Sequence, residues 1–190
     1  MKKKFLLITG GTGGHVIPAQ NLANYLFKKK INCRIILDKR GYKYINNFEG
    51  KIDIINSSNL NGNIIFKVFG LINLFFGFIQ SFIIIFKFKP KTVISFGSYA
   101  SFFPLLSCLI LKPFFKIDLF IHEQNSILGR TNSFYLKYVN KILLNFDISS
   151  KINSKYHLKT HVVGFPEPYK KDNRIKEYDD LGNKFRIFIS

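Results

Sequence analysis

The chain has 190 residues, enough for one domain and part of a second, and 47% of them are hydrophobic. This apolar content excludes intrinsic disorder. The two cysteines, Cys33 and Cys108, are too few for a disulfide scaffold, which fits a protein of a reducing compartment. Lysine and arginine number 29 against 11 acidic residues, a formal net charge of +18, which indicates either a polyanionic partner or an AT-rich coding bias toward lysine, asparagine, isoleucine and phenylalanine.

The first part of the chain has the pattern of a strand, a glycine turn, a helix and a second strand. The apolar run 5–8 is too short for a secretory signal and stops at the glycines of 10–14, so it is predicted as a buried parallel strand. Pro18 suits the first turn of a helix, and apolar residues then recur at helical spacing as far as Phe27. The run 33–38 supplies the second strand of a βαβ unit.

The same alternation continues along the chain. It predicts a short helical piece at 41–47, a weak strand at 52–55, a polar loop at 56–63, a long apolar helix at 64–89, a strand at 92–96, a helix at 102–111, a strand at 117–122, a helical segment at 129–139, and strands at 141–146 and 160–163. This order is typical of an α/β fold with a doubly wound, Rossmann-like parallel sheet.

Two long stretches without a charged residue, 68–86 and 92–111, raise the question of a membrane span. As a helix the first would be about 28 Å long, close to the thickness of about 30 Å of a hydrocarbon core. Strand signals flank it, which favours a crossover helix with an apolar outer face, and Pro104 divides the second stretch into strand, turn and helix. A transmembrane span is the alternative. The small and polar residues of the first stretch recur at spacings of three and four: Gly70, Asn73, Gly77 and Gln80.

The composition changes after Gly164. Residues 166–183 mix both signs of charge and include two prolines, as a linker does, and 184–190 begin an apolar run that resembles a first strand. We therefore expect a first domain at 1–165, an interdomain linker at 166–183, and the start of a truncated second domain at 184–190. Up to residue 160 there are 23 basic and 6 acidic residues, so the first domain carries +17 of the charge.

The strongest local motif is the glycine-rich segment 10–14 with His15, between a strand and a helix. Glycines let the backbone approach a ligand, and a helix N-terminus offers free N–H groups, which suits a phosphate or diphosphate. The Walker A ending is missing, and the dinucleotide fingerprint fails because Val16 stands where its third glycine belongs. Asp38 would still suit a ribose, so nicotinamide binding is one alternative and a turn without a ligand is another.

Two more polar motifs follow predicted strands. The turn 96–101 (FGSYAS) lies between a strand and a helix, and 122–125 (HEQN) follows the next strand, with 129–132 (GRTN) close behind. The carboxyl ends of parallel strands share one edge, so these loops are expected to face the crevice where open α/β sheets bind ligands. Four consecutive polar residues at 122–125 indicate a functional cluster, with a solvated loop as the alternative.

Together, the GGTGGH loop followed by Pro18, the FGSYAS turn and the HEQN and GRTN segments closely resemble the amino-terminal half of the MurG family, over residues 1 to about 165. The resemblance implies an inverting glycosyltransferase of the two-domain GT-B type, with no cofactor and no essential metal. It implies transfer of N-acetylglucosamine from UDP-GlcNAc to undecaprenyl-diphospho-muramyl-pentapeptide (lipid I), which gives lipid II in peptidoglycan synthesis, and a peripheral position on the cytoplasmic face of the bacterial inner membrane.

The resemblance also implies roles for single residues. The catalytic candidates are His15 and Glu123. From the residues themselves, His15 at a helix N-terminus can be the base for the acceptor hydroxyl or a donor to a phosphate, and Glu123 is the competing base. His15 is favoured as the base, because a neutral histidine at a helix N-terminus can accept a proton. The substrate-binding candidates include donor contacts at Thr12, Gly13, Gly14 and Asn125, and further contacts at Gly97, Ser98, Tyr99 and Asn132.

The chain departs from the family pattern in two places. Ser98 stands where the family has a second glycine, which narrows the approach of a phosphate. Phe165 and Pro168 replace the asparagine and arginine of an Asn-Pro-x-Arg pattern, so the donor contact of that arginine is absent or comes from elsewhere. Because most of the donor domain is also missing, residues 1–190 alone are expected to be inactive.

The expected partners are UDP-GlcNAc, lipid I and an anionic membrane surface. The apolar helix 68–86, with Lys67, Lys87 and Lys89 at its ends, fits docking on such a surface. A non-catalytic, membrane-docking subunit that binds acceptor and needs a separate donor-binding chain is the alternative. No nucleic acid is expected, because only the charge suggests it and no basic-aromatic binding motif is present.

Overall fold

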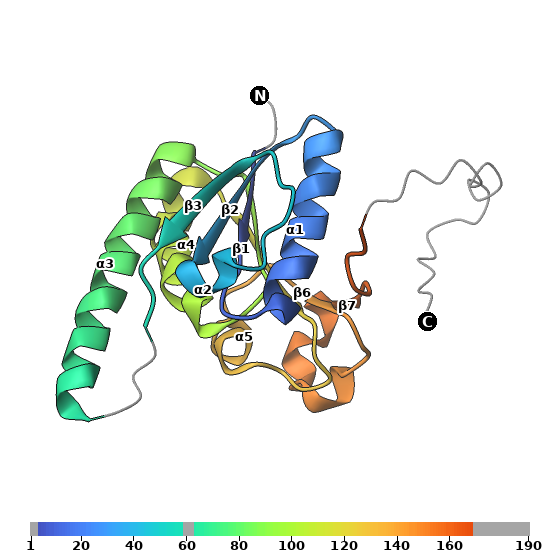
Figure 1. Cartoon of the computed structure of the whole chain (residues 1–190). Helices are drawn as coiled ribbons and strands as arrows, with labels where there is room; N and C mark the ends of the chain where they lie inside the picture. Colours follow the sequence, from blue (N-terminus) through green and yellow to red (C-terminus); the bar gives the residue numbers. More distant parts are fainter. Residues whose placement is uncertain (1–3, 59–62, 169–190) are drawn as a thin grey trace.

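A parallel β-sheet forms the centre of the fold. The computed structural model describes residues 4–58 and 63–168, and in this part of the chain seven strands pair in the order β3-β2-β1-β4-β5-β6-β7, every pair parallel (Figure 1). Their bounds are β1 Lys4–Ile8, β2 Asn32–Asp38, β3 Lys51–Ile55, β4 Thr92–Ser95, β5 Asp118–Glu123, β6 Lys141–Leu144 and β7 Thr160–Val162. The strand order reverses between β1 and β4, so this is the switch point of the sheet.

Helices cover both faces of the sheet, which confirms the predicted doubly wound α/β architecture (Figure 1). The α-helices are α1 Gly13–Lys28, α2 Lys39–Tyr42, α3 Ile64–Phe88, α4 Phe102–Phe115 and α5 Arg130–Tyr135, and short 3-10 helices lie at Tyr99–Ser101, Ser149–Lys151 and Ser154–Lys159. The helix α1 packs on one face, and α3, α4 and α5 pack on the other.

The core has two layers because the side chains of each strand alternate between the faces. In β1, Leu6 and Ile8 pack toward α3 and α4 with Ile85, whereas Leu7 packs toward α1 with Ala19. All five of these residues are fully buried. Burial on both faces explains why the strands are continuous apolar runs rather than alternating ones.

Several helix boundaries differ from those predicted. The helix α1 begins at Gly13, not near Pro18, because Gly13 and Gly14 take helical conformation after Thr12, so Pro18 lies in the second turn. The helix α4 continues past residue 111 to Phe115, and the helical segment predicted at 129–139 ends at Tyr135. The short helical piece predicted at 41–47 is α2, which starts directly after β2.

The helix α3 is the predicted crossover between β3 and β4. Its inward stripe includes Gly77 and Ser81, and Gly77 is required because a Cβ there would lie 2.0 Å from the carbonyl oxygen of Asn56. The Oε1 atom of Gln80 accepts a hydrogen bond of 2.7 Å from the backbone N–H of the same Asn56. The small and polar stripe therefore fits the helix against the chain that leaves β3.

The outer surface of α3 is apolar and exposed. We call this surface the apolar face, and it includes Phe66, Val68, Phe69, Leu71, Ile72, Phe75, Phe76, Ile83 and Phe86 of α3, with Ile110 and Phe114 of α4. Within the described residues, Phe66–Phe88 is the one helix long and apolar enough to cross a membrane. The last turns of α3 belong to the core through Ile85 and Phe88, as the crossover interpretation predicts.

The chain leaves the sheet after β7 and lies against α1, where Asn21 donates a hydrogen bond of 2.8 Å from Nδ2 to the carbonyl oxygen of Pro166. The rest of the predicted linker and the predicted strand at 184–190 lie outside the described residues.

Candidate active site

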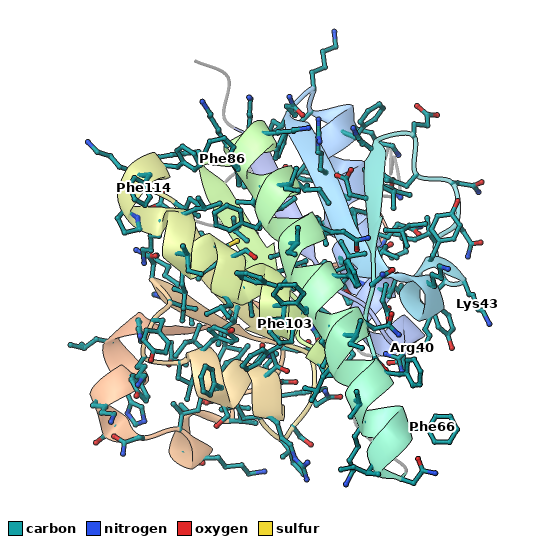
Figure 2. All side chains as sticks on the ribbon, turned by 90° about the vertical axis from the view of Figure 1, so that its left-hand side faces the viewer. Arg40, Lys43, Phe66, Phe86, Phe103 and Phe114 are labelled. Carbon is teal, nitrogen blue, oxygen red and sulfur yellow. The ribbon has the colours of Figure 1, made fainter. Side chains whose placement is uncertain are left out.

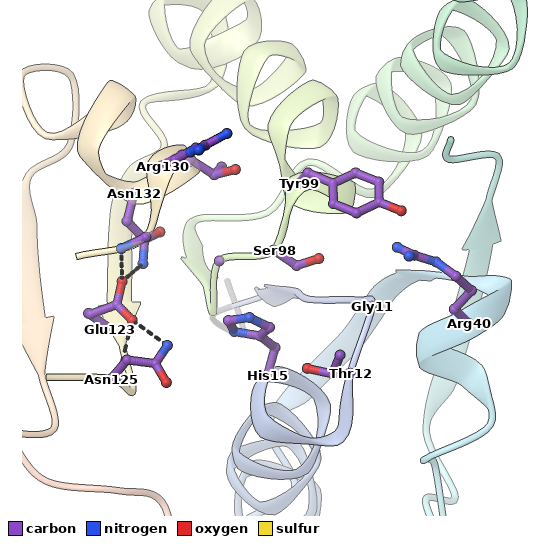
Figure 3. A pocket seen from close by; sticks show the side chains of 13 residues that line it. Gly11, Thr12, His15, Arg40, Ser98, Tyr99, Glu123, Asn125, Arg130 and Asn132 are labelled. Carbon is purple, nitrogen blue, oxygen red and sulfur yellow. Dashed lines mark hydrogen bonds between the residues drawn. The ribbon is translucent and has the colours of Figure 1, made fainter. Parts of the chain in front are cut away.

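A cavity of about 350 Å³ opens at the carboxyl edge of the sheet, at the switch point between β1 and β4 (Figure 3). It is lined by Gly11, Thr12, His15, Arg40, Gly97, Ser98, Tyr99, Glu123, Asn125, Gly129, Arg130, Thr131 and Asn132. The structure therefore brings together all the predicted site residues except Gly13 and Gly14. These two glycines form the start of α1, where Gly13 faces Tyr44 and Ile17 instead of the cavity.

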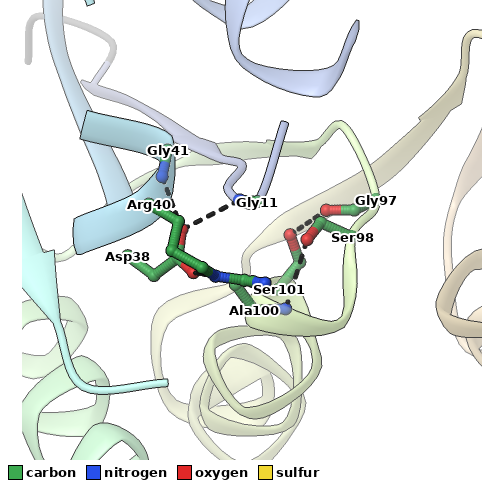
Figure 4. Close-up of polar contacts among 8 residues, drawn as sticks. All are labelled: Gly11, Asp38, Arg40, Gly41, Gly97, Ser98, Ala100 and Ser101. Carbon is green, nitrogen blue, oxygen red and sulfur yellow. Dashed lines mark hydrogen bonds and ion pairs between the residues drawn. The ribbon is translucent and has the colours of Figure 1, made fainter. Parts of the chain in front are cut away.

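The loop after β1 is held in place by Asp38 at the end of β2. The buried Asp38 carboxylate accepts hydrogen bonds at Oδ1 from the backbone N–H groups of Gly11 (2.8 Å) and Gly41 (3.0 Å), and its Oδ2 pairs with Arg40 at 2.9 Å (Figure 4). Gly11 has φ +77°, a conformation that favours glycine. Because Asp38 serves the protein's own groups, its geometry argues against the ribose-binding alternative.

The loop after β4 lies against the first loop. Ser98 has φ +74°, which costs a non-glycine residue roughly 1 kcal/mol or more, and its Oγ accepts a hydrogen bond of 3.4 Å from the N–H of Ala100. A Cβ added to Gly11 would lie only 2.8 Å from Ser98 Oγ. Both loops therefore face one crevice, as predicted, and the serine that departs from the family pattern puts a hydroxyl between them (Figure 4).

The ring of His15 is fixed by its Nδ1 atom. This nitrogen lies 2.8 Å from the carbonyl oxygen of Phe96 and 2.9 Å from Oε1 of Gln124. A carbonyl oxygen can only accept, so Nδ1 must carry the hydrogen, and the lone pair of the neutral ring is then on Nε2. Nε2 has no hydrogen-bond partner among the residues that the structure describes, and His15 lines the cavity. This arrangement presents a free base to the cavity.

Glu123, the other predicted base, is buried and fully hydrogen-bonded. Its Oε1 accepts from the backbone N–H and Nδ2 of Asn125 at 3.1 and 3.0 Å, and its Oε2 accepts from the N–H of Gly129 and Nδ2 of Asn132, both at 2.8 Å (Figure 3). Four donors on one carboxylate favour a role in holding the loop after β5. Asn132 is equally buried, and its Nδ2 also donates to the carbonyl oxygen of His122.

The segment 122–125 is not the solvated loop that was the alternative interpretation, since His122, Glu123 and Gln124 are all buried. His122 packs against the Phe96 ring, with centroids 5.2 Å apart, and its Nε2 lies 3.0 Å from the carbonyl oxygen of Gly164. Burial lowers the pKa of His122, an effect that the hydrogen bond to Gly164 and the nearby Glu123 charge oppose. The ring is therefore neutral near neutral pH.

Two arginines flank the cavity, and neither was among the predicted site residues (Figure 3). Arg40 lies with its guanidinium carbon 4.5 Å from the centre of the Tyr99 ring. Burial raises the pKa of the Tyr99 hydroxyl, and Arg40 opposes this, so the hydroxyl stays protonated as a hydrogen-bond donor. Arg130 approaches from α5. Two cations and a glycine loop beside a helix N-terminus suit a diphosphate.

No group of three or more histidine, cysteine or acidic side chains that could hold a metal ion occurs among residues 4–58 and 63–168.

Residues 5–144 match the family model of the glycosyltransferase family 28 N-terminal domain. The chain belongs to this family. Proteins from Rickettsia bellii and Protochlamydia amoebophila, both named UDP-N-acetylglucosamine–N-acetylmuramyl-(pentapeptide) pyrophosphoryl-undecaprenol N-acetylglucosamine transferase, are 31% and 32% identical to it. The alignments cover 98% and 95% of this chain and 51% and 47% of those proteins. The chain thus spans about half the length of these curated relatives, and the resemblance to the MurG family is confirmed.

Solved structures agree on the fold. The crystal structure of Acinetobacter baumannii MurG superposes with a TM-score of 0.71 at 21% identity, over 88% of this chain and 47% of that one. The S. aureus MnaA–UDP co-structure gives a TM-score of 0.61 at 14% identity, over 86% and 44% of the two chains. The predicted GT-B amino-terminal architecture is therefore confirmed.

Proposed function

We propose that this chain is the acceptor-binding half of an N-acetylglucosaminyltransferase that converts lipid I to lipid II with UDP-GlcNAc as donor. The observation that carries the proposal is the cavity at the switch point, where His15, two glycine loops and two arginines meet in a family 28 domain. In this proposal 1–165 binds acceptor, 166–183 links the domains, and 184–190 begins the donor-binding domain.

The reaction would be a direct displacement with inversion. The 4-hydroxyl oxygen of the muramyl sugar attacks the anomeric carbon of GlcNAc, the bond from that carbon to the UDP oxygen breaks, and UDP leaves with the electron pair. The hydroxyl proton passes to Nε2 of His15, the ring atom that is free in the cavity. Glu123 holds the loop that carries Asn125 and Asn132.

The charges of the cavity suit the substrates. Arg40 and Arg130 would pair with the acceptor diphosphate, assisted by backbone N–H groups of the glycine loop and of the α1 N-terminus. Most of UDP-GlcNAc would be bound by the donor half. The donor contacts proposed for this half are Thr12, Gly13, Gly14 and Asn125, with Gly97, Ser98, Tyr99 and Asn132 as the remaining substrate-binding residues.

The apolar face would dock on the anionic cytoplasmic surface of the membrane. Since α3 starts from the carboxyl end of β3, its first turns lie toward the same edge of the sheet as the cavity, and Figure 2 shows Phe66 toward the end of the molecule that carries Arg40. Lys67, Lys87 and Lys89 lie within or beside the helix, and each basic residue near an anionic surface contributes about 1 kcal/mol. A lipid-linked acceptor would then reach the cavity directly from the membrane.

Leu71→Glu is expected to weaken binding of the chain to vesicles that contain phosphatidylglycerol by roughly tenfold. The change removes a side chain that is 55% exposed on the apolar face and adds a negative charge, and burial of a leucine contributes about 1.5–3 kcal/mol. Co-sedimentation against lipid concentration measures the effect. Leu158→Glu is the matched control, because Leu158 is 99% exposed outside the apolar face. Equal binding by the two variants would contradict docking through α3.

The proposed function is tested with the 190-residue chain and a soluble, short-chain lipid I that carries a fluorophore on its peptide. We expect saturable binding by fluorescence anisotropy, competition by unlabelled lipid I, and no incorporation of labelled GlcNAc from UDP-GlcNAc. Transfer is expected only from a protein in which this chain continues into a donor-binding domain. Absence of acceptor binding, or transfer by residues 1–190 alone, would overturn the proposal.

A further inference from the structure

Gln124 connects two histidines of the site, His15, which lines the cavity, and His122, which is buried. Gln124 is only 7% exposed, with Oε1 2.9 Å from Nδ1 of His15 and Nε2 3.0 Å from Nδ1 of His122. The same Nε2 lies 3.1 Å from the carbonyl oxygen of His122. Its backbone carbonyl is also fixed, by a hydrogen bond of 3.1 Å from Nδ2 of Asn145. Gln124 belongs to the polar cluster predicted at 122–125, but no role was predicted for this residue itself.

Three backbone carbonyl oxygens determine where every proton of this network lies. The carbonyl of His122 can only accept, so the amide group of Gln124 facing it is the NH2 end, and the oxygen end faces His15. The carbonyl of Phe96 requires a hydrogen on Nδ1 of His15. The carbonyl of Gly164 requires a hydrogen on Nε2 of His122, whose Nδ1 then accepts from Gln124. These requirements are mutually consistent, and one arrangement satisfies all of them.

We propose that Gln124 is a positioning residue that holds the His15 ring with its Nδ1–H inward and its Nε2 lone pair toward the cavity. This proposal rests on the proposed function only for the chemical role of Nε2 of His15, which is to accept the proton of the acceptor hydroxyl. The placement itself is a property of the folded domain. Since the Gln124 amide is held from the other side by His122, and His122 by Gly164, the His15 ring is tied to the point where the chain leaves the sheet.

The protonation pattern can be read from the histidine side chains of the 190-residue chain by long-range 1H–15N NMR, without any substrate. We expect His15 as the Nδ1–H form and His122 as the Nε2–H form. His157 is an internal reference, because its Nε2 lies 3.1 and 3.0 Å from two backbone carbonyl oxygens. An Nε2–H form of His15 as the major species would overturn the proposal.

Gln124→Met removes the second acceptor of His15 and the donor to His122 at similar side-chain length. We expect the Nε2–H form of His15 to become populated and the His122 signals to shift, with His157 unchanged. Gln20→Met is the matched control, because Gln20 lies within α1, the helix that carries His15, but bonds the backbone of Asn46 outside the cavity. Identical histidine spectra of Gln124→Met and Gln20→Met would overturn the proposal.

Gln124→Glu separates the two ends of the amide and serves if the methionine variant does not fold. The carboxylate still accepts from Nδ1–H of His15, so that ring should keep its form, whereas His122 loses its donor and should change. A change at His15 with none at His122 would overturn the proposal. In the two-domain enzyme, Gln124→Met is expected to lower kcat by about tenfold or more with little change in KM. Absence of any transfer by the unaltered two-domain enzyme would contradict the proposed function, but it would not affect the NMR test of how Gln124 positions His15.

Discussion

His15→Ala is expected to lower kcat of the two-domain enzyme by about a hundredfold or more, with a small change in KM for lipid I. General base catalysis contributes about 10²–10⁴-fold to a rate, and Nε2 of His15 is the ring atom free to take the proton of the acceptor hydroxyl. Binding of the acceptor depends mainly on charge and backbone donors, which the change leaves in place. Initial rates of labelled GlcNAc incorporation, with both substrates varied, measure the two constants.

Two further variants make the result specific. His15→Gln retains an N–H group that can bond the Phe96 carbonyl but has no basic nitrogen. If kcat falls because the basic nitrogen is lost, and not because the packing changes, this variant should be as inactive as His15→Ala. His161→Ala alters an exposed histidine of β7 outside the cavity and should keep full activity. Activity of His15→Ala within tenfold of the unaltered enzyme would remove His15 from the role of base.

The features that the sequence predicts correctly are local ones. The apolar run 5–8, the glycines that stop it and the helical spacing up to Phe27 lie within one βαβ unit, so short-range rules suffice for β1, α1 and β2. The cavity was predictable for a related reason: three polar motifs each follow a strand, and parallel strands place their carboxyl ends together. The start of α1 was missed because glycines favour turns in general, whereas here two of them take helical conformation.

The features that the sequence does not predict depend on contacts between distant segments. Gln124 and His15 are 109 positions apart, and no spacing rule pairs them. Arg40 could have been noticed as the cation next to Asp38 at the end of a strand, but its stacking on Tyr99 requires the switch point to be formed first. The sequence predicts Glu123 as a catalytic candidate because it is a carboxylate in a polar motif. Only the four hydrogen-bond donors around it in the structure indicate that it organises a loop.

Glu123→Gln is expected to destabilise the 190-residue chain by about 3 kcal/mol, although it changes a single atom. One carboxylate oxygen becomes an NH2 group, which would face two N–H donors whichever way the amide turns, since each oxygen of Glu123 accepts from two of them. A buried donor left without a partner costs about 1–3 kcal/mol. Urea unfolding followed by circular dichroism measures the change. Glu49→Gln, at an exposed position, should change stability by less than about 0.5 kcal/mol.

The same variant decides between the two roles of Glu123 in catalysis. If Glu123 only holds the loop after β5, the folded fraction of the two-domain Glu123→Gln enzyme retains part of its transfer activity at low temperature, because His15 is intact. If Glu123 is also the base, the folded fraction of that enzyme loses transfer by the factor of about 10²–10⁴ expected for loss of a general base. The first outcome together with an inactive, stably folded His15→Ala enzyme assigns the proton to His15, since a carboxylate with four donors has already committed its lone pairs to the protein.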